Sequence, residues 1–409
     1  MLNKIWASFF LVAVLAGGYR WLVLGDAAVW AAMVSSAFTM AKTAFEIALG
    51  LTGMMCLWLG LMRLGEKGGA VDLLARAFTP LLSRLFPGVP AGHPAIGAMI
   101  MNLSANMLGL DNAATPLGIK AMKELQTLNP EPERATDAQI LFLVLNTACF
   151  TLVPASIFVY RAQLGAADPT DVFLPVLIAT YCSTLVGLLV TGTVQRLKLW
   201  DPVVLAYLGG MTTAVAGLLL YFGRLERAEL ERQSSLLSNF LIFAIMVVFV
   251  ALAFRRKEPV YDTFVGGAKE GFEVAVRIIP YLVAMLVAIG ILRASGALDL
   301  LLDGVRWGVA SLGFDTRWVD GLPTALLRPL SGSGSRGMML ETMKTHGADS
   351  FAGRLVCIIQ GSSETTFYIL AVYFGAVGIR RERYAVPCGL AADLAGYTAA
   401  VFLCYLFFG

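Results

Sequence analysis

The chain of 409 residues is 58% hydrophobic and only 14% charged, with a formal net charge of +3 at pH 7. Soluble domains carry charges on about a quarter of their residues, so this composition excludes an ordinary soluble protein and predicts a polytopic membrane protein. The small net charge is concentrated in loops, which indicates membrane topology and argues against a nucleic-acid-binding surface.

Nine apolar segments approach the roughly 20 residues that cross a bilayer. We predict spanning helices at residues 5–24, 45–64, 138–160, 171–194, 201–222, 236–254, 276–293, 352–377 and 385–408. Amphipathic helices between them are expected to lie along the interface or pack on the bundle, at residues 28–43, 68–86 and 297–312. The expected class is therefore all-α.

The basic residues of the short loops predict the orientation. Three loops are rich in them: Arg196 and Lys198; Arg255, Arg256 and Lys257; Arg380, Arg381 and Arg383. Loop 162–170 has no basic residue, and loop 222–236 alternates basic with acidic residues. The positive-inside rule then places the N-terminus in the cytoplasm and the C-terminus outside.

Two stretches of about a hundred residues look like copies of each other. AKTAFE at 41–46 resembles AKEGFE at 268–273, and DLL recurs at 72–74 and 299–301, both at an offset of 227. Five predicted spans separate the two starts, and an odd number makes the copies inverted. Many secondary transporters are built this way. We expect an N-terminal spanning and interfacial helix at 1–40, repeats at 41–194 and 261–409, and a linking helix pair at 195–260.

Each copy contains a polar, glycine-rich break, at residues 102–118 and at 331–337. A lipid-facing helix does not tolerate so many polar groups, so we predict a re-entrant hairpin at each break. The second break, with its serines, glycines and Arg336, is typical of an anion-binding nest of backbone amides. It lacks the residue order of a P-loop, which argues against nucleotide hydrolysis.

Two predicted spans are also interrupted by polar residues. Asn146, Thr147, Thr151 and Pro154 interrupt one, and residues 360–366 (QGSSETT) interrupt its counterpart. We expect the four polar segments to form a substrate site from Asn102, Ser104, Asn106, Asn112, Asn146, Ser333, Ser335, Arg336, Gln360, Ser363 and Glu364. The alternative is that small polar residues only join helices, at about 0.6 kcal/mol per hydrogen bond.

Ionisable residues at membrane depth by default mark ion or proton pathways. Asp111, Glu364 and Asp393 are therefore candidates for coupling to an ion, Na⁺ or H⁺, and a structural pair with Arg336 is the competing interpretation. The six cysteines and two histidines show no metal-site spacing, and no cofactor is expected. No pairing of a nucleophile with a base is recognisable, so we do not expect an enzyme.

The segment 102–123 (NLSANMLGLDNAATPLGIKAMK) resembles the spore maturation protein A family. The segments 331–343 (SGSGSRGMMLETM) and 358–381 (IIQGSSETTFYILAVYFGAVGIRR) resemble the spore maturation protein B family. Both families belong to the nucleoside-recognition, or Gate, domain group, which concentrative nucleoside transporters and ferrous-iron permeases share. The resemblance implies a bacterial inner-membrane protein in which two Gate domains are fused.

The sequence thus favours an ion-coupled secondary transporter of a small polar solute, either nucleoside-like or a small organic anion. The alternative is a non-transporting membrane component of envelope or spore-maturation machinery. The expected partners are the lipid bilayer, the solute and, by analogy with elevator-like transporters, further copies of the chain. A fold-level resemblance does not supply a substrate.

Overall fold

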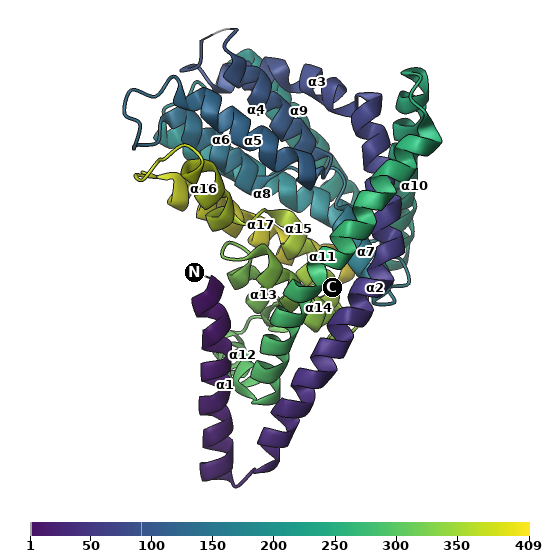
Figure 1. Ribbon diagram of the computed structural model, residues 1–409, viewed down its shortest axis with the longest axis vertical. Helices are drawn as coiled ribbons and strands as arrows, with labels where there is room; N and C mark the ends of the chain where they lie inside the picture. Colours follow the sequence, from purple (N-terminus) through teal and green to yellow (C-terminus); the bar gives the residue numbers. More distant parts are fainter. Residues whose placement is uncertain (1, 91) are drawn as a thin grey trace.

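The computed structural model of this chain consists of helices joined by short loops (Figure 1). It describes residues 2–90 and 92–409, with the backbone alone at residues 2, 3, 5 and 111–113. Within that part, the single β contact is an isolated bridge between Arg134 and Arg381. The predicted all-α class is confirmed.

Two series of helices follow the same order along the described chain. The first comprises α2 (Ala28–Gly68), α3 (Ala70–Leu85), α4 (Pro94–Met107), α5 (Asp111–Gln126), α6 (Asp137–Ala148), α7 (Ala155–Gln163) and α8 (Phe173–Val194). The second comprises α11 (Val260–Ala294), α12 (Ala297–Ser311), α13 (Leu322–Leu327, after the short 3₁₀ helix Arg317–Gly321), α14 (Gly332–His346), α15 (Phe351–Ser362), α16 (Thr366–Gly375) and α17 (Ala385–Phe408). Outside the two series lie α1 (Leu2–Leu24), α9 (Pro202–Phe222) and α10 (Arg227–Arg255).

Eight segments of the described chain are long and apolar enough to cross a membrane, as expected for a multi-pass membrane protein. They are Trp6–Leu24, Ala28–Gly68, Phe173–Val194, Pro202–Phe222, Arg227–Arg255, Val260–Ala294, Phe351–Gly375 and Ala385–Phe408. Each corresponds to one of the nine predicted spans.

The ninth predicted span, residues 138–160, is divided into α6 and α7. α6 ends at Ala148 because Cys149 has a left-handed backbone (φ 32°), and Pro154, which has no N–H to donate, precedes α7. The counterpart is divided as well, because Ser363 is extended between α15 and α16. The interruptions predicted from the polar residues are therefore present in both helices.

The interfacial helix expected at residues 28–43 is instead the first part of α2. This helix continues over 41 residues, and Gly69, with φ 85°, ends it. Neither glycine nor proline occurs between residues 28 and 49, so the sequence contains no residue that would stop the helix. The boundary expected after residue 40 falls inside α2. The other two amphipathic helices are present as α3 and α12.

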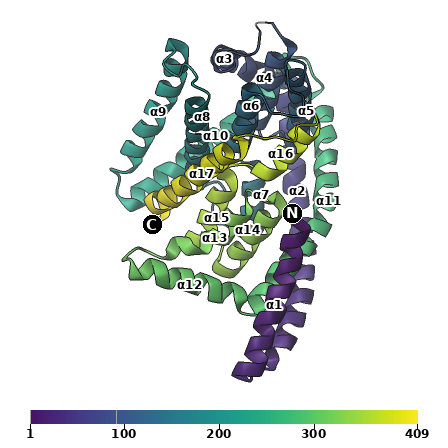
Figure 2. The same ribbon diagram turned by 90° about the vertical axis from the view of Figure 1, so that its left-hand side faces the viewer.

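The long helices α2 and α11 pack side by side along much of their length (Figures 1 and 2). Glycines permit a close approach: a Cβ at Gly267 would lie 2.5 Å from the Leu59 carbonyl oxygen, and one at Gly271 would lie 2.6 Å from that of Met55. Gly290, further along α11, lies against Met40. Residue numbers fall along α2 as they rise along α11, so the two helices are antiparallel. Small residues at such contacts are typical of membrane helix pairs.

The last helices of the two series, α8 and α17, also pack against each other. Ser183 of α8 donates a hydrogen bond of 2.9 Å to the carbonyl of Ala392 in α17. Gly187 lies against Ala392, and Gly396 lies against Ser183, so this pair is antiparallel too. α6 and α15 both pack on these two helices, which places the two interruptions close together.

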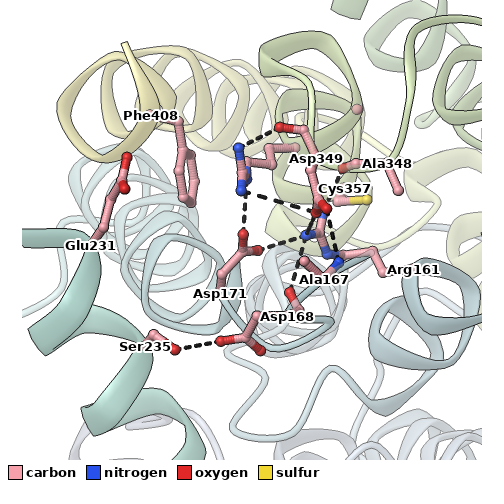
Figure 3. A network of polar contacts seen from close by, with 12 residues as sticks. Arg161, Ala167, Asp168, Asp171, Glu231, Ser235, Ala348, Asp349, Cys357 and Phe408 are labelled. Carbon is pink, nitrogen blue, oxygen red and sulfur yellow. Dashed lines mark hydrogen bonds and ion pairs between the residues drawn. The ribbon is translucent and has the colours of Figure 1, made fainter. Parts of the chain in front are cut away.

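A group of charges, which we call the Arg161 cluster (Arg161, Asp168, Asp171, Asp349 and Arg354), joins the two series at one end (Figure 3). Arg161 and Asp171 are buried, and the other three are partly exposed. The fully buried Arg161 side chain pairs with Asp171 at 2.8 Å and with Asp349 at 3.0 Å. Its remaining N–H groups donate to carbonyl oxygens of the Asp168–Pro169 loop and of residue 348. Arg354 contacts the other oxygen of Asp171 at 2.8 Å. The loop after α7 is thus fastened to the start of α15.

The two loop aspartates of this cluster differ in pKa. Burial raises the pKa of Asp171 above its ordinary value, in spite of the guanidinium groups of Arg161 and Arg354. Burial acts in the same direction on Asp168, but hydrogen bonds, chiefly from Ser235 and Thr170, outweigh it and lower the pKa of that carboxyl. Asp168 therefore stays ionised, and its hydrogen bond to Ser235 fastens the loop to α10.

A second connection joins the loop before α6 to the loop after α16. Arg383 donates to the Asp137 carboxylate at 2.7 Å and to the Ala135 carbonyl at 3.0 Å. The Ala135 N–H donates to the carbonyl of Arg381 at 3.0 Å. In both connections, the start of an interrupted helix meets the chain that follows the interrupted helix of the other series.

Candidate functional site

A polar cavity of about 150 Å³ lies where the two interrupted helices meet. Its walls come from α2, α4, α7, α14, the end of α15 and the two interruptions. The lining residues with polar side chains are Asn106, Cys149, Thr151, Ser156, Arg328, Arg336, Gln360 and Glu364, and apolar residues such as Met55, Trp58 and Met62 close the α2 side.

Backbone hydrogen bonds hold the two interruptions together. The Glu364 N–H donates to the Thr147 carbonyl at 2.7 Å, across the two series. Within each series, a backbone N–H in or just after the interruption donates to a carbonyl oxygen from an earlier part of the same series. Leu152 N–H donates to the Met107 carbonyl, and Phe367 N–H donates to the Pro329 carbonyl. The polar backbone of the interruptions is thus partly satisfied inside the protein, as a membrane interior demands.

The charged groups of the cavity are two guanidinium groups and one carboxylate. The buried Arg328 donates through Nε to the Ser363 carbonyl at 2.8 Å, and its Nη2 lies 3.4 Å from the Glu364 carboxylate. The Arg336 guanidinium lies over the Tyr160 ring, 5.7 Å from its centroid. Two of the three charged side chains among the described lining residues are thus guanidinium groups, which suit carboxylate or phosphate ligands.

Two amide side chains complete the polar surface. Gln360 is buried, and its Oε1 has no hydrogen-bond partner among the described residues. Asn106 donates to Asn146 Oδ1 at 2.7 Å while facing the cavity. A buried acceptor without a partner is costly, so Gln360 offers a position for a donor group of a bound molecule.

Four of the expected site residues therefore line one cavity: Asn106, Arg336, Gln360 and Glu364. Ser104, together with Asn106 and Cys149, lines a second, mainly apolar cavity of about 100 Å³ between α3, α4, α8 and α9. The side chains of Asp111 and Asn112 lie outside the described residues.

Asn102 and Asn146 lie in a buried hydrogen-bond network with Tyr373 rather than on the cavity wall. Asn102 Nδ2 donates to the Ala114 carbonyl at 2.7 Å and lies 3.3 Å from the Tyr373 hydroxyl. Asn146 Oδ1 accepts from Tyr373 at 3.2 Å, and its Nδ2 donates to the Phe142 carbonyl. These contacts join α4, α6 and α16.

The expected serines bond to neighbouring protein groups. Ser333 lies 3.3 Å from the Ser331 hydroxyl, and Ser335 donates to the Gly332 carbonyl. Ser331 is the N-cap of α14, so the predicted break begins one residue before the helix and its remaining residues form the first helical turns. The Ser363 hydroxyl lies 3.4 Å from that of Tyr397, while its carbonyl binds Arg328.

Asp393, the third ionisable candidate, is buried in α17 and is not among the cavity-lining residues. Thr366, the first residue of α16, donates a hydrogen bond of 2.6 Å to its Oδ2. Glu364 does have the structural pairing that the sequence left open, but its partner is Arg328 and not Arg336.

The sequence reasoning missed Arg328. This residue lies in an apolar run between Leu327 and the Pro329–Leu330 pair, directly before the serine–glycine break. The same test that selected the acidic candidates, an ionisable residue inside an apolar segment, would have selected it. In the described residues, no group of three or more His, Cys, Asp or Glu side chains could hold a metal ion.

Comparison with known proteins places this chain in a family. The chain matches the family described as "Gate: Nucleoside recognition" over residues 48–164 and 275–380, more than half of its length. It is 47% identical over 154 residues to spore maturation protein B of Bacillus subtilis (strain 168), covering 38% of this chain and 85% of that protein. It is 43% identical over 146 residues to spore maturation protein A of the same organism, covering 36% and 74%. The two relatives match different halves, consistent with a fusion. No solved structure matches the chain.

Proposed function

This chain belongs to the Gate, or nucleoside-recognition, family of membrane proteins, and we propose that it is an ion-coupled secondary transporter of a small polar solute in the bacterial inner membrane. The observation that carries the proposal is the polar cavity at the meeting point of two interrupted helices. Secondary transporters bind their substrates in such places, between repeats and near the middle of the membrane.

Alternating access would rest on two inverted copies of one unit. A two-fold axis perpendicular to a helix generates an antiparallel neighbour, and both pairs of corresponding helices, α2 with α11 and α8 with α17, are antiparallel. Since all four are long enough to span a membrane, the axis would lie in the membrane plane. α4 packs against α5, and α13 packs against α14. Each pair would then be a re-entrant hairpin, and the two hairpins would enter from opposite sides of the membrane.

The proposed orientation places the N-terminus in the cytoplasm. The basic loops support it, because two of them gather around α3: Arg256 pairs with Asp72 at 2.7 Å, and Arg84 pairs with Asp201 at 3.1 Å. Asp201 follows the Arg196–Lys198 loop directly. This basic end faces the cytoplasm under the positive-inside rule, which puts the Arg161 cluster on the outer side.

The solute would carry both a hydrogen-bond donor and an anionic or strongly electron-rich group. Gln360 Oε1 would accept from the donor, and Arg336 would contact the anionic group. Glu364 with Arg328 would provide further polar contacts. A nucleoside-like molecule or a small organic anion meets these demands. During transport, the hairpins would move against a scaffold that includes α9 and α10.

A thermal-stability screen of the detergent-purified protein against nucleosides, nucleobases, amino acids, carboxylic acids and Na⁺ tests the proposal. A ligand at 100 times its dissociation constant stabilises the folded state by about 2.7 kcal/mol. The expected result is a saturable shift for one class, reduced in Gln360→Ala and retained in Gln233→Ala, a matched glutamine outside the cavity. Uptake of the same compound into proteoliposomes would follow. A stable partner protein without any ligand shift would instead favour a non-transporting component.

A further inference from the structure

Asp393 differs from the other buried acidic residues of the described chain. Three acidic residues are buried: Asp171, Glu341 and Asp393. Asp171 lies against two guanidinium groups, and Glu341 pairs with Arg293 at 2.7 Å. Asp393, only 1% exposed, forms no ion pair within 4 Å in the described residues, and its Oδ1 has no hydrogen-bond partner there.

Two hydroxyl side chains, those of Thr366 and Ser363, act on this carboxyl group. Thr366 donates to Oδ2 at 2.6 Å. The neighbouring glycines of α17 lie against small polar residues: Gly389 lies against Thr366 and Thr147, and Gly396 lies against Ser362 and Ser183. The titratable or charged groups that act on Asp393 are Arg328, Glu364 and, from α17 itself, Tyr397. Arg328 is already bound to the Ser363 carbonyl and to Glu364.

An ionised carboxylate in this position would be buried with neutral hydroxyl donors and, in the described chain, no cation within 4 Å. Burying a charge costs several kcal/mol unless a partner compensates it, and such groups usually neutralise instead. A neutral carboxyl group with one hydrogen bond from Thr366 fits the observed surroundings. Glu364 differs, because its side chain is 43% exposed and lies 3.4 Å from Arg328, so it can remain ionised.

We infer that Asp393 holds a proton at neutral pH and that this proton is the coupling ion of the transporter; the coupling rests on the function proposed above. The site is separate from the polar cavity but adjoins it through the chain. Ser363 and Glu364 contact Arg328, and Thr366, two residues after Glu364, contacts Asp393.

Competition for Arg328 provides the coupling step. While Asp393 is neutral, Arg328 stays with the Ser363 carbonyl and Glu364. Loss of the proton creates a buried negative charge, and Arg328 is a cation whose charge acts on it. Movement of Arg328 towards Asp393 would release Glu364 and rearrange the cavity wall. The proton and the solute would then each favour one of the two positions of Arg328, and a shared two-state element of this kind is the requirement for coupling.

Infrared titration of the purified protein tests the proton site without any transport assay. A protonated carboxyl group gives a carbonyl stretching band that an ionised carboxylate lacks. We expect such a band at neutral pH in the unmodified protein, its loss in Asp393→Asn, and its retention in Glu364→Gln. Thr366→Val should keep the band and move it to higher frequency, because the hydrogen bond to Oδ2 is lost. Absence of the band at neutral pH, or its persistence in Asp393→Asn, would overturn the assignment.

The coupling step has its own measurement. Cys149 lines the polar cavity, so its modification by a charged thiol reagent, with the other five cysteines replaced by alanine, reports on the cavity. The thiolate is the reacting form, so the rate rises with pH in every variant. Relative to the rate in Asp393→Asn at the same pH, the rate in the protein that keeps Asp393 should change by about tenfold as the infrared band disappears, which corresponds to about 1.4 kcal/mol. A ratio of the two rates that is independent of the band would refute the coupling while leaving both the proton site and solute binding intact.

Discussion

The Arg161 cluster and the polar cavity both place guanidinium groups beside carboxylates inside an apolar protein, but they differ in how closely their polar groups are paired. Each guanidinium nitrogen of Arg161 has an acceptor, from two carboxylates and three carbonyls. Asp171 Oδ1 has no hydrogen-bond partner in the described chain, but it lies 2.8 Å from the Arg161 guanidinium. In and beside the cavity, Gln360 Oε1 and Asp393 Oδ1 also have no hydrogen-bond partner there, and Asp393 has no ion pair within 4 Å. A closely paired network stabilises one arrangement of the protein, whereas unsatisfied groups leave room for a ligand, a proton or a second arrangement.

The largest expected effect is on folding, in the Arg161 cluster. Arg161→Met should destabilise the protein by roughly 3–5 kcal/mol, because breaking a buried ion pair leaves Asp171 and Asp349 with less compensation. Heating followed by size-exclusion chromatography would measure this. Arg232→Ala, which removes an exposed pair with Glu229, is the control and should melt like the parent. An equally stable Arg161→Met would show that the cluster does not hold the two series together.

The two amides expected from the sequence to act alike should separate. Gln360→Ala should weaken solute binding by about 1–3 kcal/mol without changing the melting temperature, because no protein donor depends on Oε1. Asn146→Ala should instead lower stability by a similar amount, since Asn106 and Tyr373 lose their acceptor. Melting curves and a binding isotherm for the solute found in the screen would separate the two. A destabilised Gln360→Ala would place that residue in the structural network.

Each region also contains a native thiol. Cys149 lines the cavity, while Cys357 is fully buried beside the Arg161 cluster (Figure 3). In variants that keep one cysteine each, a charged thiol reagent should modify Cys149 several-fold faster than Cys357, because water reaches only the cavity. Bound solute should slow the first reaction alone. Equal rates for the two thiols would mean that the cavity is closed to water in this state.

The smallest effect concerns acid stability. The hydrogen-bonded Asp168 has a pKa below its ordinary value of 3.8. Its contribution is therefore present above pH 3.8 and is lost as the pH falls through the lowered value. Asp171, with a raised pKa, has the opposite effect: its ionisation lowers the stability of the folded protein as the pH rises above 3.8. Melting temperatures between pH 3 and pH 6 should show a smaller loss on acidification in Asp168→Asn than in the parent. An unchanged profile would show that the hydrogen bonds from Ser235 and Thr170 do not favour the ionised form.

The sequence by itself determined the features that follow from local chemistry. Apolar length specified the membrane-spanning segments, because a bilayer requires about 20 apolar residues. Polar and proline residues marked both helix interruptions, around Pro154 and Ser363. The division predicted between residues 43 and 45 is wrong, because α2 is continuous from Ala28 to Gly68 and no glycine or proline between residues 28 and 49 stops it.

Only the tertiary structure decided which polar residues share a cavity. Asn102 and Asn146 have the same side-chain chemistry as Asn106. Both of them are hydrogen-bonded to the Tyr373 hydroxyl, whereas Asn106 faces the cavity. The pairing of Glu364 with Arg328 likewise depends on two segments that meet in space. A hydrogen bond forms only when donor and acceptor lie within about 3 Å of each other. The spacing of residues along the chain does not determine the distance between segments that are far apart in sequence.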